Sequence, residues 1–381
     1  MRRRTYWNRV GSFVSILTLL VSLVFPPASA QQSDRITAIV PQLETTIAQA
    51  LKATGVPGVA VAIVDRDKVV YIKGFGVREI GKPAAVDPDT VFQLASVSKP
   101  IASTVVAALV GDGVVRWDDP IIKHDPSFRL SDPWVTENVT IRDMFSHRSG
   151  LPDHAGDALE DMGYDRMAVI HRLRYQKLES SLRSTYKYTN FGLTAAAAAA
   201  AKASGKTWED VSSERLYRRL GMNNTSSRYA DYLAASNRAS LHVEIDGKWV
   251  AKYQRNPQEQ SPAGGVSSTV RDMAQWLRLQ LAAGKFNGTE VIAAAALAET
   301  HRPQMVSRPA ADPAKDHPDF YGLGWNVAYD DHGRVRLSHS GGFNLGAATT
   351  VALYPSEQLG IVVLSNAQPV GIPESIARSF F

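Results

Sequence analysis

A serine and a lysine three residues apart, Ser96 and Lys99, follow an apolar run in the stretch FQLASVSKP. Residues at this spacing share one face of a helix, so the lysine amine can reach the serine hydroxyl if a helix begins here. The helix N-terminus favours developing negative charge, and an amine near neutrality can take the hydroxyl proton. The pair therefore indicates an activated serine nucleophile. Ser184 and Lys187 form a second such pair, which we interpret as chance because no helix is predicted to open from that serine.

Two further motifs favour the first pair as the catalytic one. A Tyr-x-Asn motif at 188–190 combines a phenol for proton transfer with an amide that can hydrogen-bond a substrate carbonyl. A His-Ser-Gly-Gly motif at 339–342 ends a predicted strand, where glycine lets the backbone approach a ligand closely. A strand amide opposite the helix N-terminus would form an oxyanion hole. Each motif has an ordinary structural interpretation, but three such motifs in this order favour chemistry.

The elements that must position these motifs are strands at both ends of the chain and helices in the middle. Runs at 58–65 and 68–76 predict a hairpin, and strand patterns recur through 321–366. Helices are predicted over 33–54, with Pro41 in the first turn of the regular helix, and over 98–111. Most of 157–280 and the segment from 373 to 381 are also predicted to be helical.

This order predicts an α+β fold, in which one antiparallel sheet is built from both chain ends and flanked by the terminal helices. The sheet lobe would comprise about 31–95 and 320–381, and a mainly helical lobe about 96–319. The cleft between the lobes is then the expected site. Because the last helix is only about nine residues long, a truncated chain is also compatible with the sequence.

The first thirty residues resemble a secretory signal peptide. A basic segment, an apolar run and the small-residue exit PPASA follow one another, so cleavage is expected after Ala30. The apolar run is shorter than the ~20 residues of a membrane span, which disfavours the alternative of an uncleaved anchor. We therefore expect residues 31–381 to form one exported domain, periplasmic or secreted, without a stable membrane span. The general and twin-arginine export routes both stay open.

Composition excludes several classes of function. Four of the five excess positive charges lie in the signal segment, and no Lys/Arg-rich block follows it, so no nucleic-acid partner is expected. The absence of cysteine excludes thiol nucleophiles, iron–sulfur clusters and cysteine zinc sites. The nine histidines include no His-x-x-x-His pair, and we expect neither a metal nor a cofactor.

The motif order resembles the penicillin-recognising serine hydrolases, in particular their class C β-lactamase-like branch. That branch includes β-lactamases, D-amino-acid peptidases, penicillin-binding proteins and carboxylesterases. Four further stretches are similar to sequence motifs of this family and lie at the expected places: FSHRSGLPDH, LGMNNTS, SPAGGVSSTVRDMAQWL and YGLGW. The resemblance therefore covers nearly the whole mature chain.

The resemblance implies a role for each motif residue. Ser96 would be the acylated nucleophile and Lys99 and Tyr188 its proton partners, with the acylation base open between the last two. The implied substrate-binding residues are Asn190, His339, Ser340 and Gly341. The oxyanion hole would use the backbone amides of Ser96 and Gly342. No metal or cofactor is implied.

Two departures from the family pattern bear on the substrate. His339 stands where β-lactamases of this class usually have a lysine. Because histidine is mostly neutral near pH 7, this argues against an efficient β-lactamase and leaves an esterase or peptidase open. The Pro-Gly often found before Tyr-x-Asn is replaced by LRSTYK, which leaves Arg183 able to reach the cleft.

The expected function is an exported serine hydrolase that forms an acyl-enzyme with an amide, β-lactam or ester carbonyl of a small molecule or peptide. The alternative is a non-hydrolytic penicillin-binding, cell-wall peptide-binding or sensor protein of the same fold. The presence of Ser96, Lys99 and Tyr188 together favours the enzyme, because a binding protein needs no proton relay. The sequence leaves the oligomeric state open.

Overall fold

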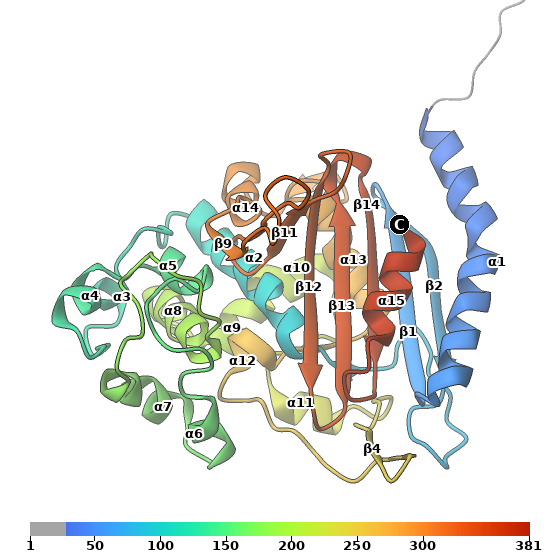
Figure 1. The fold of residues 1–381 in the computed structure, drawn as a ribbon, viewed down its shortest axis with the longest axis horizontal. Coiled ribbons are helices and arrows are strands. Elements are labelled where there is room, and N and C mark those ends of the chain that lie inside the picture. The colour runs from blue at the N-terminus through green and yellow to red at the C-terminus, as the bar shows by residue number, and fades with distance from the viewer. Residues whose placement is uncertain (1–27) are drawn as a thin grey trace, which may run out of the picture.

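The computed structural model describes residues 28–381, and the predicted signal peptide lies almost entirely outside this range. Within the described range, eight strands form one antiparallel sheet in the order β2-β1-β14-β13-β12-β11-β10-β9 (Figure 1). They are β1 (Gly58–Asp65), β2 (Lys68–Gly76), β9 (Met305–Arg308), β10 (Asp319–Tyr321), β11 (Asn326–Tyr329), β12 (Val335–Phe343), β13 (Ala347–Tyr354) and β14 (Leu359–Ser365). Strands β1 and β14, from opposite ends of the chain, pair directly, which confirms the predicted architecture.

Short strands form separate pairs outside the main sheet. These are β3 (Phe92–Gln93) with β6 (Ser267–Ser268), β4 (Val243–Ile245) with β5 (Lys248–Val250), and β7 (Lys285–Phe286) with β8 (Thr289–Glu290). The α-helices are α1 (Ala28–Thr54), α2 (Ser98–Gly111), α3 (Ile121–His124), α4 (Pro133–Asn138), α5 (Ile141–Phe145), α6 (Asp157–Asp161), α7 (Arg166–Arg172), α8 (Asn190–Ala203), α9 (Trp208–Ser212), α10 (Arg218–Leu220), α11 (Tyr229–Ala234), α12 (Ser261–Gly264), α13 (Val270–Leu281), α14 (Ala294–Thr300) and α15 (Ile372–Phe380). Single turns of 3₁₀ or π type are η1 (Ala95–Val97), η2 (Leu173–Tyr175), η3 (Ser213–Tyr217) and η4 (Pro355–Glu357).

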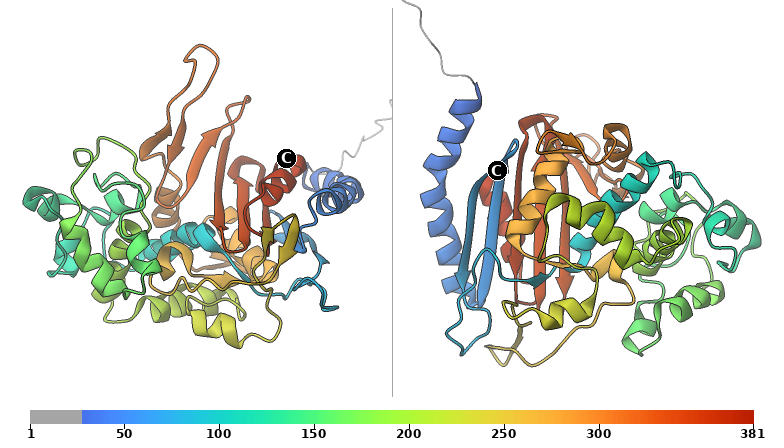
Figure 2. Two further views of the ribbon diagram at one scale, coloured as in Figure 1. Left: turned by 60° about the horizontal axis from the view of Figure 1, so that its bottom comes forward. Right: turned by 180° about the vertical axis from the view of Figure 1, so that it is seen from behind.

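The sheet is covered on both faces. Helices α1 and α15 pack on one face, and α13 packs on the other against β1 and β14 (Figures 1 and 2). Every residue of β1 is buried as a result. Its side chains alternate between the two apolar cores, with Val59, Val61 and Ile63 on the α1 side and Ala60, Ala62 and Val64 on the other. A strand between two covered faces needs a continuous apolar run rather than an alternating one, which is the pattern that the sequence has here.

Helix α1 is longer than predicted. It runs from Ala28 to Thr54 with Pro41 inside it, whereas the sequence predicted a regular helix only from that proline onward. A proline within a helix removes one backbone hydrogen bond and costs about 3 kcal/mol. Apolar residues on both sides of it, Ile36 and Leu43, are buried against the sheet. This packing stabilises the helix on both sides of the proline.

Most other predicted elements agree with the structure. The hairpin at 58–76 and the helix at 98–111 have the predicted bounds. The stretch 116–134, for which no element was predicted, contains α3 and the start of α4. Strand β9 at 305–308, outside the range predicted for the sheet lobe, adds to the sheet edge.

Among the described residues, we find no helix that combines the length and the apolar character needed to cross a membrane.

Candidate active site

The turn that carries Ser96 is wedged between the sheet and α2. Ser96 lies in η1, directly before α2. Strand β12 passes so close that a Cβ on Gly341 would lie 2.8 Å from the Ser96 amide nitrogen and 2.3 Å from the Leu94 carbonyl oxygen. Ala95 adopts φ 47°, a left-handed conformation that costs an L-residue about 1–2 kcal/mol. Close packing therefore holds the serine in a strained turn.

Lys99 is enclosed beneath this turn and is 0% exposed, which excludes a solvated lysine on the first turn of a helix. Its Nζ donates to Ser96 Oγ at 3.2 Å, to Asn190 Oδ1 at 2.7 Å and to the Ala263 carbonyl at 2.8 Å. Burial lowers the pKa of Lys99 to about 7, although the negative charge of Asp157 acts in the opposite direction. A substantial fraction of this lysine is therefore a neutral amine near pH 7.

Tyr188 approaches Ser96 from the other side. Its hydroxyl donates to Ser96 Oγ at 2.9 Å, and Lys99 Nζ lies 4.5 Å from the centre of its ring. Burial raises the pKa of Tyr188 well above its ordinary value, and the hydrogen bond to Ser96 only partly offsets this. The phenol therefore keeps its proton at neutral pH, so that Ser96 faces one group able to accept a proton and one able to donate it.

The loop at 147–154 positions Tyr188 from behind. His147 Nδ1 accepts a hydrogen bond from the Thr189 amide at 3.2 Å, and its ring packs 4.6 Å from the Tyr188 ring. At the far end of the loop, the His154 amide donates to the Tyr188 carbonyl at 2.8 Å, and Asp153 Oδ1 accepts from the Tyr188 amide. In the structure, the loop fixes the backbone of the tyrosine.

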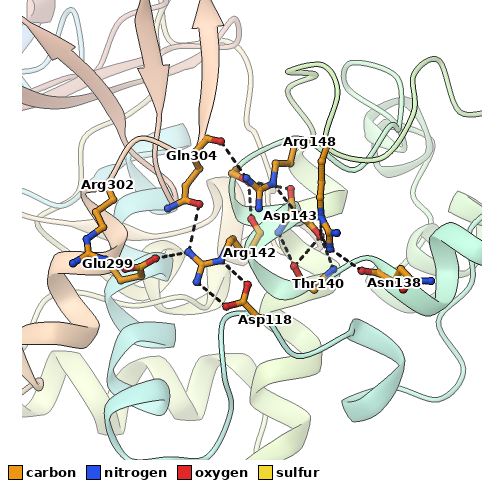
Figure 3. Close-up of polar contacts among 11 residues, drawn as sticks. Asp118, Asn138, Thr140, Arg142, Asp143, Arg148, Glu299, Arg302 and Gln304 are labelled. Atoms are coloured by element: carbon orange, nitrogen blue, oxygen red, sulfur yellow. Dashed lines mark hydrogen bonds and ion pairs between the residues drawn. The ribbon is translucent and has the colours of Figure 1, made fainter.

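A buried carboxylate anchors that loop to the rest of the molecule. Asp143, whose side chain is 0% exposed, pairs with Arg148 at 2.7 Å (Figure 3). It also pairs with Arg183 at 2.9 Å. Arg148 also donates to the carbonyl oxygen of Gln304, beside β9, at 3.1 Å. The sequence left Arg183 able to reach the cleft. Its guanidinium is instead bound to Asp143, and it is not among the cleft-lining residues.

His339 is buried rather than presented to the cleft. It is 4% exposed, and its ring nitrogens contact the Tyr321 hydroxyl at 2.9 Å and the Ser340 carbonyl at 2.7 Å. Since a carbonyl only accepts, Nδ1 carries the proton and Nε2 accepts from Tyr321. Burial, with a smaller contribution from Lys99, lowers the pKa of His339 to about 3. The ring is therefore neutral, and both nitrogens are committed to the protein.

A cleft of about 880 Å³ opens in front of Ser96. Among the predicted site residues, the cleft is lined by Ser96, Tyr188, Asn190 and Gly342, and not by His339, Ser340 or Gly341. The two predicted oxyanion donors, Ser96 and Gly342, thus both border it.

Acidic side chains dominate the charged part of this cleft wall, namely Asp157, Glu160, Asp161 and Glu259. Arg255 is the single lysine or arginine among the described residues that line it. That arginine is already paired with Glu160 and Asp161, so it is not free to bind a substrate anion.

Comparison with known proteins shows to which family the chain belongs. Residues 43–376, most of the chain, match the Beta-lactamase family. The chain belongs to the beta-lactamase family. A solved structure, that of the octameric penicillin-binding protein homologue from Pyrococcus abyssi, aligns with a TM-score of 0.76 at 23% identity, over 89% of this chain and 75% of that one. At this identity the match shows the fold alone, and it agrees with the family resemblance read from the sequence.

Curated relatives of this beta-lactamase family member include hydrolases. The unguisins hydrolase ungD′ of Aspergillus campestris is 29% identical over 335 residues, which cover 84% of this chain and 60% of that protein. Protein flp of Staphylococcus aureus (strain MW2) is 22% identical over 340 residues, which cover 88% of this chain and 64% of that protein. The chain therefore spans less than two thirds of the length of these relatives.

Several residues that contact the site were not predicted from the sequence. Asp157 contacts Asn190, Ala263 supplies a carbonyl to Lys99, and Tyr321 fixes His339. The stretches that contain Ala263 and Tyr321 were seen as family phrases without individual roles. Asp157 stands three residues after His154 in the sequence, a spacing that could have suggested the contact between them. Nothing in the sequence indicated that this pair lies beside Asn190.

Proposed function

We propose that this protein is a serine hydrolase that works through an acyl-enzyme on Ser96. The observation that carries the proposal is the position of Ser96 Oγ, within hydrogen-bond distance of both Lys99 Nζ (3.2 Å) and Tyr188 Oη (2.9 Å). The membership of the family and the hydrolase among the relatives support the same reaction class.

In the proposed reaction, Lys99 rather than Tyr188 is the acylation base. Its lowered pKa provides a neutral amine near pH 7, whereas the raised pKa of Tyr188 disfavours a phenolate. Lys99 takes the Ser96 proton as Oγ bonds to the substrate carbonyl carbon. The amides of Ser96 and Gly342 donate to the oxygen that becomes negative.

Collapse of this intermediate breaks the bond to the leaving group. Tyr188 gives its proton to the departing oxygen or nitrogen, and Lys99 returns the proton it holds to Tyr188. Water then attacks the acyl group, with Lys99 and Tyr188 serving again as proton acceptor and donor. The same relay thus serves both halves of the reaction.

Within this reaction class we propose an ester or a peptide amide as substrate rather than a β-lactam. A penicillin carries a carboxylate next to the reacting carbonyl. The cleft offers it no free cation among the described residues, because His339 is buried and neutral and Arg255 is paired with acids. The carboxylate of Asp157 would repel it. Neutral or amine-bearing acyl groups meet no such cost.

We also propose that the protein is exported and loses residues 1–30. The support is the sequence alone: a basic start, an apolar run and small residues at 28 and 30. Mass spectrometry of the N-terminus after expression with its leader tests this, and an intact residue 1 on the exported protein would contradict cleavage.

The catalytic proposal is tested by hydrolysis of a short-chain p-nitrophenyl ester by residues 31–381, compared with the Ser96→Ala variant. We expect the variant to lose the activity. Ser184→Ala, in the second Ser-x-x-Lys pair, is a matched control, because that serine is exposed and contacts only neighbours in its own loop. We expect it to keep wild-type activity.

Equal hydrolysis by wild type and Ser96→Ala would remove Ser96 from the mechanism. Benzylpenicillin tested alongside then separates esterase from β-lactamase. Stable addition of a penicilloyl mass to Ser96, without turnover of either substrate, would instead support the binding or sensor protein.

A further inference from the structure

A chain of hydrogen bonds leads from Lys99 out to the cleft. Lys99 Nζ donates to Asn190 Oδ1 at 2.7 Å, and Asn190 Nδ2 donates to Asp157 Oδ2 at 2.7 Å. The same carboxylate oxygen lies 2.8 Å from His154 Nδ1. Asn190 is buried at the start of α8, and Asp157 begins α6 at the cleft wall. No catalytic step proposed above uses Asp157.

This carboxylate decides which way the Asn190 amide faces. An ionised carboxylate only accepts hydrogen bonds, so the group of Asn190 that faces Asp157 must be the NH₂. The amide oxygen is then the atom that faces Lys99. If the amide were reversed, two oxygens would face each other at the Asp157 end, and the NH₂ would face the amine at the other.

The orientation of Asn190 in turn controls the lone pair of Lys99. Two neighbours of Lys99 Nζ, Asn190 Oδ1 and the Ala263 carbonyl, can only accept hydrogen bonds. A neutral amine has two N–H groups, and these two acceptors occupy both. Its lone pair is left for the third neighbour, the hydroxyl of Ser96, which accepts a hydrogen bond from the protonated amine and donates one to the neutral amine. A reversed Asn190 would donate to the amine and compete for that lone pair.

The negative charge of Asp157 also affects the pKa of Lys99. Tyr188, His147 and His339 also lie close to Lys99, and burial keeps each of them neutral near pH 7. His154 faces the carboxylate of Asp157 rather than Lys99. Asp157 Oδ1 has no hydrogen-bond partner among the described residues, so no further protein donor offsets the charge on that oxygen. Its charge raises the pKa of Lys99 against the effect of burial.

We propose that Asp157 is a positioning residue for the Ser96–Lys99 pair: its carboxylate orients the Asn190 amide and thereby directs the Lys99 amine to the Ser96 hydroxyl. This inference rests on the proposed function for its effect on turnover. Its structural part, the coupling of Asp157 to Lys99, holds for the folded protein whether or not it hydrolyses the substrate tested.

The test replaces the carboxylate by its isosteric amide, Asp157→Asn. We expect the acid limb of the pH profile of kcat/KM to move down by roughly 0.5–1 pH unit, because a charge that favours the protonated lysine is lost. We also expect the plateau above this limb to fall about tenfold, since an amide at this position no longer prevents reversal of Asn190. Asp161→Asn is the matched control. It removes a carboxylate from the same cleft, but one that is 68% exposed and paired with Arg255.

A second variant separates positioning from a general loss of structure. In the exchange Asp157→Asn with Asn190→Asp, the new carboxylate again presents only acceptors to Lys99, and the new amide can donate to it. We expect this double variant to recover part of the plateau lost in Asp157→Asn. We also expect its acid limb to move above that of the wild type, because the charge is now next to the amine.

Titration of Lys99 by NMR in protein labelled with ¹³C at lysine Cε, assigned with Lys99→Met, measures the coupling without turnover. A lower lysine pKa in Asp157→Asn than in wild type supports the proposal even if the ester is not hydrolysed, in which case only the proposed function fails. A pKa and pH profile that match those of Asp161→Asn, in an enzyme that still requires Ser96, would overturn the role of Asp157 and leave the proposed function intact.

Discussion

Substitution of Gly341 by alanine tests whether the fit of β12 against the turn that carries Ser96 sets the rate of the proposed reaction. The added Cβ would lie 2.3 Å from the Leu94 carbonyl oxygen, 2.6 Å from Thr349 Oγ1 and 2.8 Å from the Ser96 nitrogen. Two of these atoms are backbone and cannot rotate away. Carbon makes comfortable contacts at about 3.5 Å, so β12 and the turn must separate by roughly 1 Å.

That separation would move the amides of Ser96 and Gly342 relative to each other. Loss of one oxyanion donor costs about 10²–10³ in kcat, and a 1 Å misplacement of reacting groups costs about 10². We therefore expect Gly341→Ala to lower kcat/KM about 100-fold. The overpacking itself should reduce the free energy of unfolding by about 1–3 kcal/mol, which leaves a folded protein to assay. The acid limb should stay in place, because Lys99 keeps its surroundings.

The assay is steady-state hydrolysis of p-nitrophenyl acetate across pH 5–9, with thermal unfolding of the same samples. Gly360→Ala is the matched control, since it adds a methyl group to a glycine of β14 in the same sheet. There the new Cβ would meet side chains of Leu277 and Leu353 at 3.4 Å, an ordinary contact distance. A kcat/KM of Gly341→Ala within threefold of the wild-type value would refute the reasoning, because the proposed oxyanion hole would then not depend on this contact.

Two further predictions concern titrating groups. Because Lys99 has a pKa of about 7 and acts as a base only when neutral, kcat/KM should rise with pH through about 7 to a plateau; a flat profile from pH 5 to 9 would contradict this role. For Asp143, burial raises the pKa, but hydrogen bonds from Arg183 and Arg148 outweigh it and leave the pKa lowered. The stabilisation is thus present above the ordinary carboxyl pKa and is lost as pH falls through the folded value. Asp143→Asn should lower the free energy of unfolding in urea by about 3 kcal/mol at pH 7, a difference that narrows in acid. The control is Asp118→Asn, because Asp118 is also paired with an arginine, Arg142, but is 70% exposed. This variant should lower the free energy of unfolding by less than about 1 kcal/mol, and similar decreases in the two variants would contradict the prediction.

The sequence predicted those parts of the site that local patterns encode. Ser96 and Lys99 are three residues apart on one helical turn, so their approach follows from helix geometry. That Tyr188 lies at the same hydroxyl was implied only by the family resemblance, because the two are 92 residues apart in sequence. The catalytic roles of all three stay predictions until the variants are assayed.

The parts that could not be predicted depend on contacts between distant segments. His339 was expected at the substrate, yet its burial depends on Tyr321 from a neighbouring region of the sheet. The helix through Pro41 persists because the sheet buries both of its halves, whereas local preference alone ends a helix at a proline. Asp157 escaped notice because an acidic residue at a helix start is ordinary in a sequence. Only the fold brings it to Asn190.

The pairing of β1 with β14 has a consequence for how the molecule is made. Val59 and Ser365 are partners in the sheet although about 300 residues separate them, so the centre of the sheet closes only after all the residues between them have been synthesised. Folds dominated by such distant contacts form slowly, and until β14 arrives the apolar strand β1 lacks its inner neighbour. The turn that carries Ser96 packs against β12, which also lies far beyond the serine in sequence. A fragment that ends before β12 can thus contain Ser96 and Lys99 and still lack Gly342, so the proposed oxyanion hole can form only after β12 has joined the sheet.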